Sequence, residues 1–228
     1  MKKTSAMKAM KAGRQRIKQQ KTRNPTAFYN KFNLVIEVDE SHLNKKKPGA
    51  LTRSARPQKD QVWVWGATIP RKPDRFFFKV LSHPDDAFAG KPKGTQEILK
   101  CLRALDIPKK TIIVSDCWLG TIAAVKMLKR ENNWGDMDLW HEVVNHSTGE
   151  ITNANGFTTN HIENRWGLVK AWVRKRCSGR LPSHADRHKW TRLLKEFCWR
   201  KLMSAGVSLD FGHTYFVPPA ALFTALSH

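Results

Sequence analysis

The feature that most constrains the fold of this chain is an alternation of short apolar runs with segments of helical periodicity. Three runs rich in β-branched and aromatic residues come first, at 34–39, 62–68 and 75–81. Runs of this length and composition predict strands, and their succession favours an antiparallel meander. Two further strands are expected at 111–116 and 141–146.

Helices are predicted after the meander, because apolar residues recur there every three or four positions. The expected helices lie at 95–105, 118–130, 160–175 and 190–203. The resulting order, βββαβαβα, indicates an α/β layered domain with a mixed sheet flanked by helices.

The length of 228 residues suits one main domain, which we expect at 31–205. A basic arm precedes it at 1–30, a tail follows at 206–228, and a basic loop is expected at 44–59. From Lys2 to Arg23 the arm carries nine basic residues and no acidic one. Its use stays open among a DNA-contacting tail, a nuclear address, a transit segment and a solvated tail without a dedicated role.

The net charge predicts the class of partner. With 41 Lys and Arg against 19 Asp and Glu, the chain carries a formal charge of +22. A surplus of this size attracts polyanions, and the commonest such partner is DNA or RNA. Binding to a ribosome or to an anionic membrane surface is the alternative that composition leaves open.

The cysteines and the hydropathy predict the compartment. Four cysteines lie far apart, with no CxxC pair, so neither a zinc ribbon nor a dense disulfide framework is indicated. No apolar stretch approaches the roughly 18 residues of a membrane span. We therefore expect an intracellular protein that associates with DNA, in the nucleus of a eukaryote or in the cytoplasm and nucleoid of a bacterium, and with no membrane partner.

Three carboxylates lie at positions where α/β proteins often carry catalytic or ligand-binding residues. Asp39 and Asp116 each end an apolar run, which predicts that both lie at the C-terminal tips of strands, where ligand sites of α/β sheets gather. Glu163 lies in the first turn of the predicted helix at 160–175, and Lys170 follows it two turns later on the same stripe. Each residue alone also fits a structural role: an Asp that opens a turn, or a Glu that favours a helix N-terminus.

Together, three carboxylates are what two-metal phosphoryl chemistry needs. Mg²⁺ prefers oxygen ligands and keeps open water positions. Two such ions about 4 Å apart stabilise both the attacking and the leaving oxygen of an in-line displacement. The residue types therefore predict a site for two Mg²⁺ or Mn²⁺ ions on Asp39, Asp116 and Glu163.

An ordered series of motifs resembles the ISXO-type transposase domain of insertion sequences and Merlin-type transposable elements. The resemblance spans roughly residues 33 to 200. The stretches that carry it are Val38–Ser41, Trp63–Gly66, Ile113–Trp118, His141–Ser147, Thr159–Trp166 with Lys170, and Glu196–Arg200.

This resemblance implies an RNase H-like fold and a DDE-type catalytic domain over 31–205. It implies that Asp39 and Asp116 are the two catalytic aspartates, that Glu163 is the third acid and that Lys170 is the basic residue that follows it. Relatives commonly carry an N-terminal zinc-binding or helix-turn-helix region, whereas a basic arm precedes the first strand here. The chain is accordingly expected to be a compact transposase, a truncated copy or a host-retained derivative.

Several other residues are assigned roles around this site. We expect contacts with DNA phosphates from Asn160, Arg165, Lys170, Arg174, Lys175 and Arg176. His141 and His146 flank a predicted strand. Either they approach the metal ions or the scissile phosphate, or they pair with backbone or carboxylates. Trp63, Trp65, Trp118 and Trp166 serve either as core packing or as platforms for unpaired bases, and packing is the commoner role.

The sequence thus favours a transposase that hydrolyses a phosphodiester at a transposon end and joins the freed 3′-hydroxyl to target DNA. Joining two ends requires at least a dimer on DNA, so a homo-oligomer is expected. Two other functions stay open. One is a non-catalytic DNA-binding protein derived from a transposase, and the other is a nuclease that cuts without joining.

Overall fold

The computed structural model describes residues 17, 21, 24–43, 62–70, 72, 75–81, 94–178, 181–183 and 186–204. Most of the predicted arm, the predicted basic loop at 44–59 and the predicted tail at 206–228 lie outside this part of the chain. The elements, in chain order, are α2 (Pro25–Tyr29), β1 (Leu34–His42), β2 (Trp63–Thr68), β3 (Phe76–Val80), α3 (Thr95–Arg103), β4 (Thr111–Asp116), α4 (Leu119–Glu131), β5 (Leu139–Val144), the 3₁₀ turn η2 (His146–Thr148), α5 (Asn160–Arg176) and α6 (Arg187–Ser204).

The strands form one five-stranded mixed sheet in the order β3-β2-β1-β4-β5. β2 pairs antiparallel with both β1 and β3, which is the predicted meander. β4 pairs parallel with β1 and with β5. From β1 to α5 the elements follow the predicted order of three strands, helix, strand, helix, strand, helix, interrupted only by the short turn η2.

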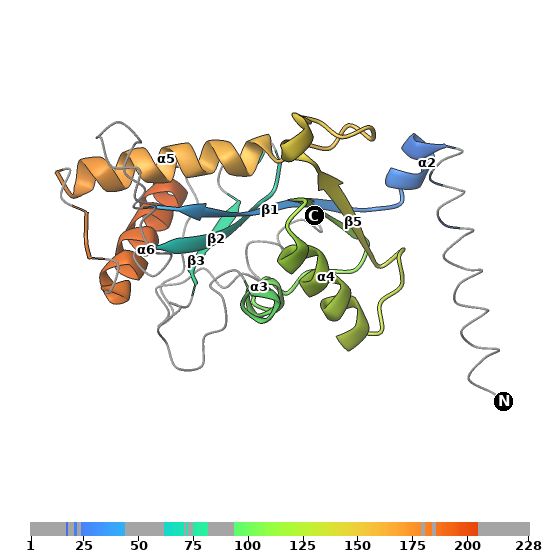
Figure 1. Ribbon diagram of the computed structural model, residues 1–228, viewed down its shortest axis with the longest axis horizontal. Coiled ribbons are helices and arrows are strands. Elements are labelled where there is room, and N and C mark those ends of the chain that lie inside the picture. The colour runs from blue at the N-terminus through green and yellow to red at the C-terminus, as the bar shows by residue number, and fades with distance from the viewer. Residues whose placement is uncertain are drawn as a thin grey trace.

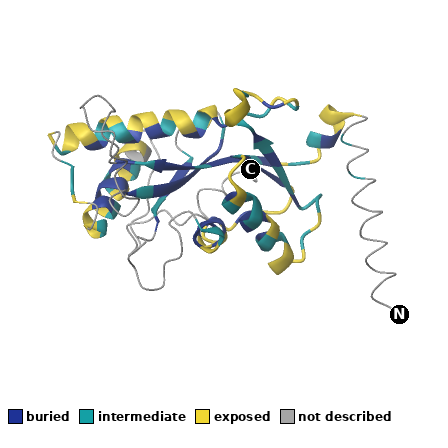
Figure 2. Ribbon diagram, in the orientation of Figure 1, coloured by how far each residue is buried: buried dark blue, intermediate teal, exposed yellow. Residues whose placement is uncertain are grey.

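Helices cover both faces of the sheet (Figure 1). The alternate residues Ile36 and Val38 of β1 belong to a core shared with α3 and α4. On the opposite face α5 and α6 pack against β2 and β3, through a second core that includes Trp166 and Phe197. Burial on both sides explains why the strands are the most buried elements of the molecule (Figure 2).

The packed body includes part of the predicted arm. Phe28 of α2 is almost fully buried and meets Trp140 edge-on, with ring centroids 4.9 Å apart. Lys21 donates a hydrogen bond to Glu142 of β5 over 2.6 Å. Residues of the segment 1–30 therefore contribute to the edge of the sheet formed by β5.

Two strands, β1 and β5, differ from the prediction by more than one residue at an end. β1 continues past residue 39 to His42, because Glu40, Ser41 and His42 pair with β2 although they are polar. β5 occupies 139–144 rather than 141–146, and residues 146–148 form the 3₁₀ turn η2. The strand at 111–116 is observed as predicted.

Candidate functional site

The two candidate catalytic aspartates stand on adjacent parallel strands. The ladder between β1 and β4 ends at the pair Glu37 and Val114. Asp39 and Asp116 lie two residues further along their strands, at matching positions. Beyond the ladder, Asp39 is paired only with Gly66 of β2 and Asp116 only with Val144 of β5. The sheet therefore opens between β1 and β4 where both carboxylates lie, the kind of point at which α/β sheets bind ligands.

Asp39 is the sixth of the nine residues of β1. The prediction that it lies at the strand tip was wrong, because the strand continues through three buried or half-buried polar residues. Its side chain points to the face covered by α5, where Trp166 donates Nε1–H to Asp39 Oδ2 over 2.9 Å. Asp39 is therefore oriented by the sheet and by a helix at the same time.

Gly66 makes this contact sterically feasible. A Cβ at Gly66 would lie 2.6 Å from Cη2 of Trp166 and 2.8 Å from Cδ1 of Phe78. Because real Cβ atoms do not approach neighbours so closely, only glycine leaves room for the indole between the sheet and α5. Gly66 is also the strand partner of Asp39, so the ring that binds Asp39 lies directly over its neighbour.

Asp116 is the last residue of β4, as predicted. Its Oδ1 accepts a hydrogen bond from the backbone N–H of Trp118 over 3.0 Å, an Asx-type turn that leads into α4. Its Oδ2 accepts no hydrogen bond from a described residue. One carboxylate oxygen of Asp116 thus shapes the loop, and the other remains for a ligand.

Three side chains of β1 form a polar ladder with α5. Glu37 bonds His161 and the N–H of Ile162, Asp39 bonds Trp166, and Ser41 accepts a hydrogen bond from Lys170 Nζ over 2.6 Å. Alternate residues of a strand lie about 6.7 Å apart, and four to five residues of a helix cover about 6–7.5 Å. The two spacings match, so each step along the strand meets the next contact along the helix.

Glu37 was not among the predicted site residues. It is 1% exposed, and its two carboxylate oxygens accept from His161 Nδ1 over 2.6 Å and from Ile162 N over 3.0 Å. It thereby caps the N-terminus of α5 from another element. Burial raises the pKa of this carboxyl, while the His161 hydrogen bond opposes that rise. The alternation Glu37, Asp39, Ser41 in β1 was the available sequence signal for a shared polar face.

Glu163 occupies the first turn of α5, as predicted, and is held from two sides. Thr159 Oγ1 donates to Glu163 Oε1 over 2.9 Å, and His146 Nε2 lies 3.1 Å from the same oxygen. Glu163 Oε2 accepts no hydrogen bond from a described residue. One oxygen therefore fixes the side chain, and the other faces solvent on an exposed side of the helix.

His146 is positioned by three contacts. Its Nδ1 lies 2.9 Å from the carbonyl oxygen of Glu150, and its Nε2 lies 2.7 Å from Thr159 Oγ1. Since a carbonyl oxygen can only accept, Nδ1 carries a proton. His146 thus links the turn after β5 to the first turn of α5, next to Glu163.

His141 lies on the opposite face of the sheet. It is paired with Ile113 within β4–β5 and forms a 2.9 Å hydrogen bond with Ser115 Oγ. Burial lowers its pKa to about 4, so the imidazole is neutral at physiological pH. The structure therefore brings His146, and not His141, to the face that carries Asp39, Asp116 and α5.

The predicted DNA contacts are distributed along α5. Asn160 lies exposed at its start, Arg165 is half-buried, and Lys170 is half-buried against Ser41. Arg174, Lys175 and Arg176 are exposed in the last turn. Thirteen residues, or about 20 Å of helix, separate Glu163 from Arg176, so these cations form two groups rather than one.

The tryptophans divide between core and surface. Trp65 is fully buried and Trp166 is 3% exposed. Trp63 packs partly against the core and its ring meets His42 at 3.3 Å between centroids. Trp118 is 43% exposed beside Asp116. Of the four, Trp118 alone presents a largely open ring next to a candidate catalytic residue.

Glu142 anchors the N-terminal segment to this half of the sheet. Its Oε1 accepts from Lys21, from Tyr29 OH over 2.5 Å and from Trp140 Nε1 over 2.6 Å. Its Oε2 accepts from the side-chain amides of Asn153 and Asn155. These hydrogen bonds lower the pKa of Glu142 against the opposing effect of its burial. No sequence pattern indicated that Glu142 would be a buried, ionised carboxylate with several hydrogen-bond partners.

The carboxylates do not yet form a closed metal site. Within the described ranges, no three His, Cys, Asp or Glu side chains gather into a group that could hold a metal ion. The oxygen-only donors Asp39, Asp116 and Glu163 nevertheless suit Mg²⁺ or Mn²⁺, and Asp116 and Glu163 each keep one uncommitted oxygen. Ionised carboxylates repel one another, so a cation would be needed to draw the three together.

The four cysteines, Cys101, Cys117, Cys177 and Cys198, are all free thiols. Among the described helices, none combines the length and the apolar character that a bilayer crossing requires. The chain matches no protein-family model, no curated protein and no solved structure.

Proposed function

We propose that this chain is the catalytic domain of a DDE-type DNA transposase, which hydrolyses a phosphodiester at a transposon end and transfers the freed strand to target DNA. The observation that carries the proposal is the placement of Asp39 and Asp116 at matching positions of two parallel strands, where the sheet opens toward the helix that bears Glu163 and Lys170.

The arrangement of the sheet supports an RNase H-like assignment. Its order is β3-β2-β1-β4-β5, with β2 antiparallel to β1 and with β4 and β5 parallel to it. The formal charge of +22 supports a polyanionic substrate. The motif series from Val38 to Arg200 supports the ISXO-type and Merlin-type elements as the family.

Asp39, Asp116 and Glu163 would hold two Mg²⁺ or Mn²⁺ ions, which would activate the attacking water or 3′-hydroxyl and stabilise the leaving oxygen. Trp166 orients Asp39 by its indole N–H, and Thr159 with His146 orients Glu163. Lys170, which contacts Ser41 on the same face, contributes a positive charge beside the scissile phosphate. A homo-oligomer on paired DNA ends would supply the second active site.

The test is metal-dependent cleavage and joining. Purified protein is incubated with supercoiled plasmid, or with duplexes that end in a 3′-hydroxyl, in Mg²⁺ or Mn²⁺. We expect nicked and joined products that disappear in Asp39→Asn and Asp116→Asn. Asp106→Asn makes the same chemical change at an exposed residue with φ 47°, a conformation that Asn tolerates, and should leave the products unchanged.

A second candidate is a non-catalytic DNA-binding protein derived from a transposase. The observation that favours it is that no three metal-binding side chains are gathered among the described residues. Tight DNA binding without any metal-dependent product, on plasmids and on 3′-hydroxyl duplexes, would support this candidate. Cleavage without joined products would instead indicate a nuclease.

A further inference from the structure

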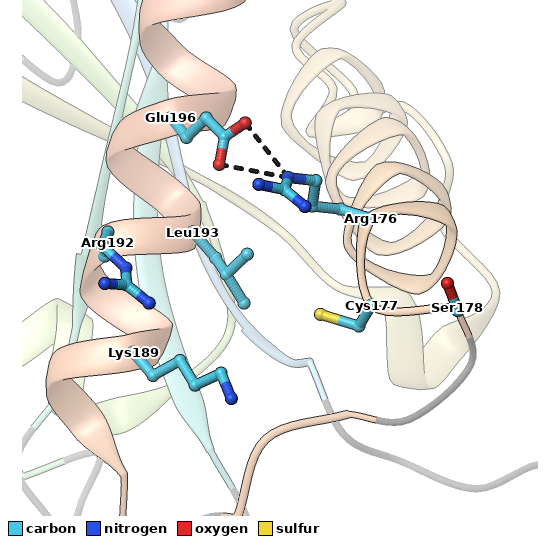
Figure 3. A pocket seen from close by; sticks show the side chains of 7 residues that line it. All are labelled: Arg176, Cys177, Ser178, Lys189, Arg192, Leu193 and Glu196. Carbon is cyan, nitrogen blue, oxygen red and sulfur yellow. Dashed lines mark hydrogen bonds and ion pairs between the residues drawn. The ribbon is translucent and has the colours of Figure 1, made fainter.

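A cleft lies between the C-terminal end of α5 and the N-terminal half of α6, far along α5 from Glu163. It has a volume of about 600 Å³ and is lined by Arg176, Cys177, Ser178, Lys189, Arg192, Leu193 and Glu196. Figure 3 shows Lys189 and Leu193 extending from α6 toward α5, and Arg176 reaching back to Glu196. A smaller hollow of about 360 Å³ adjoins it through Arg176 and adds Trp172, Lys175 and Arg200.

The two hollows are strongly cationic. They bring together five basic side chains, Lys175, Arg176, Lys189, Arg192 and Arg200, and a single carboxylate, that of Glu196. Glu196 is shared between Arg176 and Arg200, at 3.2 and 3.0 Å. Lys175, Lys189 and Arg192 form no ion pair with any described residue. The cleft therefore carries an excess positive charge that the described part of the protein does not neutralise.

Helix stability alone does not explain these cations. The basic residues in the last turn of α5 interact favourably with the negative end of its dipole. Lys189 and Arg192, in contrast, stand in the first two turns of α6, near the positive end of its dipole. Asp186, which directly precedes the helix, accepts a hydrogen bond from the backbone N–H of Lys189 over 3.0 Å and offsets part of this charge. An anionic ligand in the cleft would offset the charge of Lys189 and Arg192 that remains.

The packing holds the two helices in place around the cleft. Trp172 of α5 meets Phe197 of α6 edge-on, with ring centroids 5.7 Å apart. Arg176 and Glu196 bridge the same two helices. The cations are thus presented from two fixed helices rather than from loops, which lowers the entropy cost of binding an extended anion.

We propose that this α5–α6 cleft binds the phosphodiester backbone of a DNA duplex and that Lys189 and Arg192 are its principal phosphate contacts. The proposal deepens the proposed function and rests on it for the identity of the substrate as DNA. The cleft lies about 20 Å from Glu163 along α5, which corresponds to about six base pairs. It holds the duplex flanking the cleavage position, independently of sequence.

The experiment measures binding without catalysis. Fluorescence anisotropy with a 30-base-pair duplex of arbitrary sequence, in EDTA, compares the wild type with the double variant Lys189→Gln/Arg192→Gln across a NaCl series. Loss of two phosphate contacts should weaken binding about tenfold or more at 0.1 M salt and lower the slope of log K against log salt by about 2. Lys189→Arg, which keeps the positive charge at that position, should retain most of the wild-type affinity.

The control variant is Lys126→Gln/Arg130→Gln. Lys126 and Arg130 are exposed on α4, which packs on the opposite face of the sheet. Their substitution removes the same number of positive charges as the cleft variant does. An equal loss in both double variants would overturn the cleft as a site and leave only net charge. Unfolding curves confirm that both variants are folded.

The outcomes separate this inference from the proposed function. Cleft-dependent binding without any cleavage by the wild type supports the cleft and contradicts the transposase. Cleavage with wild-type affinity in Lys189→Gln/Arg192→Gln supports the transposase and overturns the cleft. Cleft-dependent binding to anionic phospholipid vesicles, without cleft-dependent binding to DNA, would also overturn this inference.

Discussion

The indole N–H of Trp166 donates a 2.9 Å hydrogen bond to Asp39 while the ring lies over Gly66, the strand neighbour of Asp39. The orientation of the carboxylate therefore depends on the absence of a side chain one strand away. This dependence can be tested without changing either bonded residue.

Gly66→Ala should destabilise the protein by about 1–3 kcal/mol, because its Cβ would lie 2.6 Å from Trp166 and force the ring away. Urea denaturation measures the change. Gly167→Ala is the matched control: it lies on α5 with no atom within 4 Å of its added Cβ, and should stabilise by about 0.5–1 kcal/mol. Equal effects in the two variants would contradict the steric role of Gly66.

The hydroxyl of Thr159 should control the function of Glu163. Thr159→Val removes the donor to Glu163 Oε1 and the partner of His146 Nε2, while Thr159→Ser keeps both. For a metal-binding Glu163, we expect the Mg²⁺ concentration at half-maximal cleavage to rise severalfold in Thr159→Val and to return in Thr159→Ser. If both variants lose activity without a change in metal dependence, Thr159 only stabilises the fold.

Because of His141, the free energy of unfolding should decrease as the pH becomes acidic. Its folded-state pKa of about 4 lies below the ordinary value of 6.5, so the unfolded chain binds more protons between these two values. The free energy of unfolding that depends on a neutral His141 is fully present above pH 6.5. It is lost as the pH falls toward 4, by up to about 3 kcal/mol. Urea denaturation of His141→Gln should show a shallower pH dependence in that window. His188→Gln, at an exposed position of α6, serves as control.

The hydrogen bonds to Glu142 should hold the N-terminal segment against the sheet. Tyr29→Phe removes one donor to this buried carboxylate and should cost about 1.5 kcal/mol. Burial and Glu142 raise the pKa of Tyr29 well above its ordinary range, so its phenol donates throughout the accessible pH range. Thr26→Val, which changes an exposed side chain of the same helix, should have no measurable effect. Limited proteolysis should cut the N-terminal segment faster in Tyr29→Phe alone.

The order of strands and helices could be predicted from the sequence because burial left periodic apolar patterns. The strand at 111–116 is apolar through Val114 and was located without error. The end of β1 could not be located, because Glu40 and Ser41 are buried by partners that come from distant segments. Glu40 accepts from Thr121 on α4, and Ser41 accepts from Lys170 on α5.

The candidate site shows the same limit. Asp39, Asp116 and Glu163 could be identified as residues, but their supporting partners could not. Glu142 accepts a hydrogen bond from Lys21, which lies 121 positions earlier in the chain. Glu37 forms a hydrogen bond with His161, which lies 124 positions later. Local periodicity contains no information about pairs at such separations.

The matched spacing of β1 and α5 has a consequence for how this chain can change in evolution. Because Glu37, Asp39 and Ser41 meet α5 in step, a single inserted or deleted residue between Glu37 and Ser41 would turn the following side chains to the other face of the sheet. Substitutions in this stretch remove one contact at a time, whereas a change of length removes several at once. The segment is therefore open to changes of residue but closed to changes of length.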